Sequence, residues 1–101
     1  MNKLRRKELG QVINGLSTIQ DRDDLYSLIN TLDNIKYDEE SYYDNIPENL
    51  QYSQRAEDSE MAIENLEEAL DLLNEVYDEE EFDVNNELIQ QAIDKIEDAR
   101  W

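Results

Sequence analysis

The stretch DNIPENLQYSQR, residues 44–55, holds the only proline of the 101-residue chain and lies near its middle. Pro47 disfavours a helical conformation at the residue before it, so a preceding helix should end by Asn45. Pro47 can itself open a short helical turn, and Ser53 is a good N-cap for the helix that follows. The stretch therefore predicts a corner at residues 45–53 between two helical arms.

Apolar residues recur in steps of three and four on both sides of this corner, as they do on one face of an amphipathic helix. The step pattern of the segment after the corner is that of a short coiled-coil-like seam. No segment alternates apolar and polar residues as a half-buried strand does. The four stripes are Leu9, Val12, Leu16 and Ile19; Leu25, Leu28, Leu32, Ile35 and Tyr42; Ile63, Leu66, Leu70, Leu73 and Tyr77; and Leu88, Ile89, Ala92, Ile93 and Ile96.

The stripes are interrupted within each arm as well as at the corner. We expect helix breaks near residues 19–23 and 78–86, in addition to 45–53. Acidic and amide side chains beside these breaks can accept hydrogen bonds from the first amides of a new helix. The candidate N-caps are Asp21 or Asp23 after the first break and Asp83 or Asn85 after the last.

The predicted fold is all-α, an elongated antiparallel helical hairpin or small bundle in a single domain over residues 1–101. Arm one covers residues 3–44, the corner 45–53, and arm two 54–100. A straight arm would be roughly 60 Å long at 1.5 Å per residue. A lone two-layer hairpin buries little apolar surface, which makes a homodimer plausible.

The chain carries 27 acidic and 9 basic residues, and its net charge is −18. Residues 1–7 contain four of the basic residues and no acidic one, so the rest of the chain has a net charge of −22. Such a body repels nucleic acid and membranes and attracts basic surfaces. We therefore expect neither direct nucleic-acid binding nor membrane association.

The sequence has no histidine and no cysteine, which leaves catalysis to carboxylates and tyrosines. No pair of carboxylates stands out from the others, and a solvated helix face is the simpler interpretation of them. Asp21 and Asp23 imitate the start of an EF-hand loop, but Tyr26 and Leu32 occupy the positions that require glycine and glutamate. We expect no enzymatic activity, no metal and no cofactor, in a cytoplasmic protein.

Carboxylates and tyrosines gather at the corner, and four further acids follow the third stripe. Tyrosine combines apolar area with a polar tip and is favoured at interfaces, although these rings can equally cover the thin end of a hairpin. The candidate partner-binding residues at the corner are Asp38, Glu39, Glu40, Tyr42, Tyr43, Asp44, Glu48 and Tyr52. The second candidate patch is Asp78, Glu79, Glu80 and Glu81.

Carboxylates three or four residues apart on a helix lie about 5–6 Å from one another. This spacing is within a factor of two of the phosphate spacing along one nucleic-acid strand. A helical rod of carboxylates can thus occupy a basic channel that normally binds DNA or RNA. Solubility is the competing explanation, but it needs a net charge of only about 2–8.

The sequence resembles a group of small, acidic, uncharacterised helical proteins encoded by phages and prophages of Gram-positive bacteria. The resemblance lies in the basic start MNKLRRKEL, the corner DNIPENLQYSQR and the helix EMAIENLEEALDLL. It covers residues 1–16 and 43–76, whereas 17–41 and 78–101 depart from it. It implies a mobile element acting in a bacterial cytoplasm, and it brings no known activity or site residues.

In that setting small acidic proteins often antagonise host enzymes that act on nucleic acids. The leading hypothesis is a non-enzymatic, anti-CRISPR-like inhibitor that binds the basic surface of a host nucleic-acid-binding protein, a CRISPR effector first. The alternative is an assembly module that self-associates or docks on a partner helix through the seams Leu25–Ile35 and Ile63–Tyr77. A third hypothesis makes Lys3–Lys7 a small foot that binds nucleic acid or acidic groups.

Overall fold

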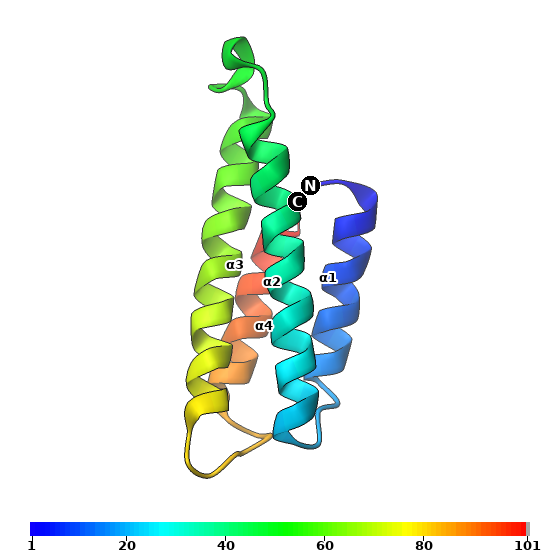
Figure 1. Ribbon diagram of the computed structural model, residues 1–101, viewed down its shortest axis with the longest axis vertical. Helices are drawn as coiled ribbons and strands as arrows, with labels where there is room; N and C mark the ends of the chain where they lie inside the picture. Colours follow the sequence, from blue (N-terminus) through cyan, green and yellow to red (C-terminus); the bar gives the residue numbers. More distant parts are fainter. Residues whose placement is uncertain (101) are drawn as a thin grey trace.

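A computed structural model describes residues 1–100, which fold into four α-helices and one short 3-10 turn, with no strand (Figure 1). Consecutive helices run in opposite directions, and the molecule measures 49 × 21 × 18 Å (Figure 1). The predicted all-α small bundle is confirmed. The elements are α1 (Lys3–Leu16), α2 (Arg22–Asp44), η1 (Glu48–Leu50), α3 (Gln54–Asp78) and α4 (Glu87–Ala99).

The corner between α2 and α3 is the one that the proline predicts. Helix α2 ends at Asp44, the turn η1 follows Pro47, and α3 begins after Ser53. The Ser53 hydroxyl accepts a hydrogen bond from the amide of Ala56 at 3.3 Å, as expected of an N-cap. The corner therefore lies where Pro47 and Ser53 predicted it.

The other two breaks differ slightly from their predicted places. The first covers residues 17–21, and at its start the Ser17 hydroxyl donates to the Ile13 carbonyl. Asp21 then caps α2, as one of the two alternatives predicted. The N-cap of α4 is Asn86, whose side chain accepts from the amide of Leu88 at 2.9 Å. The expectation of Asp83 or Asn85 is therefore wrong by one residue or more.

Both arms fold back on themselves at these breaks. Helix α1 packs against α2, α4 packs against α3, and α1 also contacts α4, so the helices close around one core. The long axis of 49 Å is accordingly shorter than a straight arm would be. The seams Leu25–Ile35 and Ile63–Tyr77 line this shared core.

The buried face of α3 is wider than the predicted stripe. Ala62, Ala69 and Val76 are fully buried, whereas Ile63 and Tyr77 remain partly exposed. Helix α3 lies between α2 and α4, and contact with two neighbours buries both flanks of its apolar stripe. The sequence pattern predicted the correct face of the helix, with Ala62, Ala69 and Val76 flanking its stripe; the structure adds that these flanking residues are more deeply buried than Ile63 and Tyr77.

A polar layer closes one end of the core. Glu39, expected on the surface, continues the buried stripe of α2 and has no exposed area. Its carboxylate accepts from the guanidinium of Arg5 at 3.1 Å and from the hydroxyl of Ser59 at 2.6 Å. Burial lowers the pKa of the nearby Met1 amino group to about 6, although Glu39 opposes the shift. This layer ties α1, α2 and α3 together.

Beyond this layer only α2 and α3 continue. The N- and C-terminal ends of the described chain lie side by side next to α2, and the corner projects past them (Figure 1). The reason is helix length, since α1 and α4 have 14 and 13 residues while α2 and α3 have 23 and 25. The projecting part, residues 40–58, is called the hairpin tip below.

The two glycines of α1 should respond differently to alanine. At Gly10 a Cβ would lie 3.2 Å from the guanidinium of Arg100, which has room to move. At Gly15 it would lie 2.7 Å from a methyl group of Leu28, which is packed against the core. We expect Gly10→Ala to raise the free energy of unfolding by about 0.5–1 kcal/mol through helix propensity, and Gly15→Ala to gain little because Leu28 must shift. Urea denaturation followed by circular dichroism at 222 nm measures both, and equal gains would contradict the expected clash.

Candidate functional site

The residues predicted to bind a partner form two groups at opposite ends of the molecule. The corner group lies at and below the hairpin tip, and Asp78–Glu81 lies where α3 ends, at the other end of the long axis (Figure 1). Because the long axis measures 49 Å, the two groups form separate patches. In the first group Asp38, Asp44, Glu48 and Tyr52 are exposed, and Glu40, Tyr42 and Tyr43 are partly buried.

Glu39 does not belong to this exposed group. Its carboxylate is buried between Arg5 and Ser59, so the expectation that it contacts a partner is wrong for this fold. The physical reason is its position one turn after Ile35, where α2 still faces α3. Its role is structural.

The tyrosines of the tip divide into supporting and exposed side chains. The guanidinium of Arg5 lies 5.4 Å from the ring centroid of Tyr42. The Tyr43 hydroxyl lies 3.4 Å from a carboxylate oxygen of Glu60, and repulsion by this carboxylate raises the pKa of Tyr43. Tyr52 is 94% exposed and contacts little of its own chain. It is the tyrosine best placed to meet a partner.

The patch at residues 78–81 is held in place by hydrogen bonds from Arg22 to its backbone carbonyl groups. The guanidinium of Arg22 donates to the carbonyl oxygens of Glu79 and Glu80 and lies over the rings of Tyr77 and Phe82. The carboxylate of Glu79 accepts from the side chain of Asn86 at 3.2 Å. The loop is thereby fixed to the start of α2, while the side chains of all four acids stay exposed.

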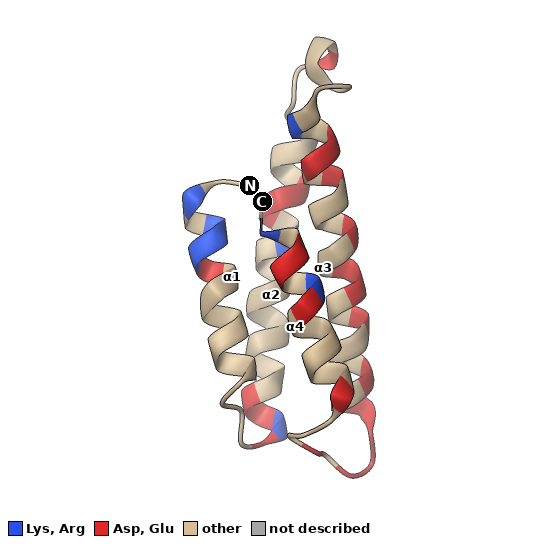
Figure 2. Ribbon diagram, turned by 180° about the vertical axis from the view of Figure 1, so that it is seen from behind, with Lys and Arg blue, Asp and Glu red and all other residues tan. Residues whose placement is uncertain are grey.

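The structure also shows a longer acidic surface that the candidate residues include only at its end. Seven exposed acids occur at steps of three or four along α3, on the face turned away from the core (Figure 2). They extend over about 31 Å at 1.5 Å per residue. We call them the α3 stripe: Glu57, Glu60, Glu64, Glu67, Asp71, Glu75 and Asp78.

The basic residues of the body lie beside the α3 stripe and leave it unpaired. Lys95 of α4 pairs with Glu68 at 2.7 Å, and this hydrogen bond raises the pKa of Lys95. Lys36 of α2 pairs with Glu40 at 3.4 Å. Within residues 1–100 no lysine or arginine forms an ion pair with the seven acids of the stripe. The sequence already shows these seven acids spaced three or four residues apart, which places them on the helix face opposite the apolar stripe.

Two further kinds of feature, a cluster of metal-binding acids and a membrane-spanning helix, are not found among the described residues. Among residues 1–100 no group of three or more acids is arranged to hold a metal ion. None of the helices in that range is both long enough and apolar enough to cross a lipid bilayer. No protein-family model, curated protein or solved structure matches the chain.

Proposed function

We propose that this protein is a non-enzymatic inhibitor of phage type, which binds the basic nucleic-acid-binding surface of a host defence protein in the bacterial cytoplasm. A CRISPR effector is the first candidate. The α3 stripe carries the proposal, because its seven carboxylates lie on one helix face without a basic partner among the described residues. The exposed acids of the tip and the patch at residues 78–81 extend this surface at its two ends.

The geometry of the stripe supports mimicry of a nucleic-acid backbone. Its carboxylates follow one another about every 5 Å along the axis, against one phosphate per 3.4 Å along one strand of a duplex. Helix α3 is held between α2 and α4, so the row is already ordered before a partner arrives. Binding then loses little conformational entropy, which favours a rigid anionic ligand over a flexible acidic tail.

The net charge of −18 supports the same proposal. It is well above what solubility of a small domain needs, and like charges three or four residues apart destabilise a helix. The charge also accelerates encounter with a basic surface through long-range attraction. A surface that weakens the fold and attracts cations is more easily explained by binding than by solubility.

The alternative, an assembly module, is less well supported. The apolar seams that it would use are buried within the monomer, with Leu25, Leu32, Leu66 and Leu73 fully inaccessible. Docking through them would require the bundle to open. Self-association through another surface remains an outcome that light scattering would detect during the test below.

The test measures DNA binding by a guide-loaded CRISPR effector in the presence of the purified protein, using fluorescence anisotropy. We expect the protein to displace target DNA, and we expect its affinity for the effector to fall about tenfold or more between 50 and 200 mM NaCl because the contacts are ionic. The same assay extends to a restriction endonuclease and a DNA glycosylase. If none of these enzymes is inhibited, or if the protein binds one with an affinity that salt does not change, the proposal is wrong.

A further inference from the structure

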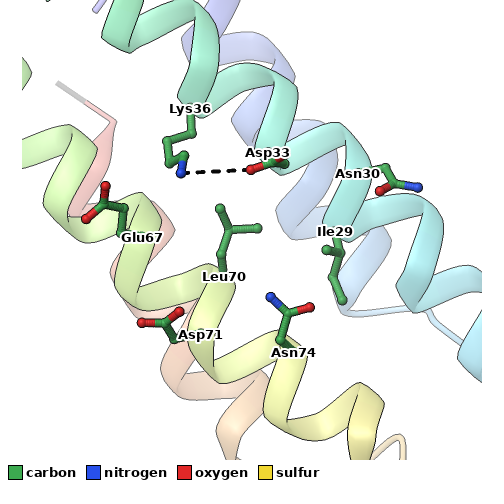
Figure 3. Close-up of a pocket in the computed structure, with 8 residues that line it drawn as sticks. All are labelled: Ile29, Asn30, Asp33, Lys36, Glu67, Leu70, Asp71 and Asn74. Carbon is green, nitrogen blue, oxygen red and sulfur yellow. Dashed lines mark ion pairs between the residues drawn. The ribbon is translucent and has the colours of Figure 1, made fainter.

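A groove of about 420 Å³ lies between α2 and α3, beside the α3 stripe (Figure 3). Its floor is apolar, since Ile29 and Leu70 point into the space between the helices and are only 9% and 7% exposed. Its rim is polar, and three of its six residues are acidic. The rim residues are Asn30, Asp33 and Lys36 from α2 and Glu67, Asp71 and Asn74 from α3.

One end of the groove already holds a cation of the chain itself. The ammonium group of Lys36 lies 3.9 Å from the carboxylate of Asp33 and 3.4 Å from that of Glu40 (Figure 3). Its side chain is only 22% exposed, so its aliphatic part is covered while its charge meets carboxylates. These pairs lie within α2, so Lys36 supplies a positive charge at the α2 side of the groove.

The α3 side of the same groove has no such cation. Glu67 and Asp71 are one helical turn apart, about 5–6 Å between their Cβ atoms, and neither forms an ion pair within residues 1–100. Asn74 follows on the next turn and adds an amide oxygen as an acceptor. The unfilled half of the groove therefore combines two unpaired carboxylates, an amide and an apolar floor.

We infer that this half of the groove binds an arginine side chain from the basic surface of the partner. The aliphatic part of the arginine lies over Leu70, and its guanidinium donates to Glu67 and Asp71. Arginine fits better than lysine because its planar group has five donors and is more weakly hydrated, and such charge-assisted bonds are stronger than neutral ones. The inference rests on the proposed function and adds one specific contact to a surface otherwise recognised by charge.

The test uses the full chain labelled with ¹⁵N and a defined probe, the peptide acetyl-Arg-Arg-Arg-amide, followed by NMR at low salt. We expect shift changes to concentrate at the side-chain amides of Asn30 and Asn74. The double variant Glu67→Gln/Asp71→Asn should bind the peptide about tenfold more weakly. The matched control Glu64→Gln/Glu75→Gln removes the same charge from the same helix outside the groove and should lose less than about twofold.

A third variant tests whether the arginine occupies the groove itself, by filling the groove with a side chain of the protein. Asn74→Lys places a tethered ammonium at the groove and is compatible with a helix, so it should reduce binding of the peptide at least as much as the double variant. The matching tri-lysine peptide should bind more weakly than tri-arginine to the wild-type protein. Equal losses in the two double variants, or unchanged binding by Asn74→Lys, would overturn the inference.

These results are separable from the proposed function. A protein that inhibits an effector in a salt-dependent way, but whose two double variants bind the peptide equally, retains the function and lacks the arginine site. A protein that binds tri-arginine in the groove but inhibits none of the three enzyme classes has the site without the proposed function. The peptide experiment thus decides whether the arginine site exists, and the inhibition assay decides separately whether the proposed function is correct.

Discussion

Replacing Glu39 with alanine should lower the free energy of unfolding by about 3–4 kcal/mol, a large part of the stability of a small domain. The carboxylate is inaccessible to water and accepts from the Arg5 guanidinium and the Ser59 hydroxyl. Its loss would leave a cationic group, whose side chain is 12% exposed, without its partner. Urea denaturation followed by circular dichroism at 222 nm measures the change.

The matched control removes the whole polar layer at once. In the variant Arg5→Met/Glu39→Met/Ser59→Ala no buried charge is left unpaired, and apolar replacement of buried ion pairs is often neutral or stabilising. We therefore expect this triple variant to recover most of the stability that Glu39→Ala loses. A Glu39→Ala protein within about 0.5 kcal/mol of wild type would show that the layer does not hold α1 to α2 and α3.

Neutralising the middle of the α3 stripe should weaken inhibition about a hundredfold while making the protein more stable. The variant Glu64→Gln/Glu67→Gln/Asp71→Asn/Glu75→Gln combines the groove and control double variants. It removes four of the seven charges proposed to meet the basic surface, each worth about 0.5–1 kcal/mol at a partly desolvated contact. It also removes like-charge repulsion between helical neighbours, which should raise the free energy of unfolding by about 1 kcal/mol. The anisotropy assay and urea denaturation give the two values.

A second surface supplies the control for net charge. The variant Glu87→Gln/Asp94→Asn/Glu97→Gln/Asp98→Asn removes the same number of charges from α4, where all four side chains are exposed. If the position of the carboxylates matters, this variant should lose less than about threefold in inhibition. Equal losses from α3 and α4 would mean that net charge alone attracts the partner, and the α3 stripe would then have no special role.

Local features of the chain were predictable from short stretches of sequence. Pro47 and Ser53 place the corner, and Asp21 caps α2, because each acts on backbone groups within a few residues of itself. These predictions needed no knowledge of which helices become neighbours. The α3 stripe was not among the predicted binding residues except for Asp78, although its period of three and four identifies one face of a helix.

The residues that depend on neighbours were not predictable in the same way. Glu39 is buried between Arg5, 34 residues earlier in the chain, and Ser59, 20 residues later. The α2–α3 groove exists only because the two long helices pack along their length, which brings Lys36 and Asp71 to the same hollow. The position of Glu39 one turn after Ile35 extends the apolar stripe of α2, but the sequence does not show which residues of other helices would bind its carboxylate.

By itself the sequence determined an all-helical chain, the place of its corner, and the faces of its helices that are apolar or acidic. It did so because propensity, capping and periodicity act over one or two turns. The tertiary structure decided that each arm folds back into a hairpin, that the seams close on one another, and that one carboxylate becomes part of the core. Those outcomes depend on which helix faces meet. The apolar pattern of one helix shows which face will be buried, but it does not show which other helix will bury it.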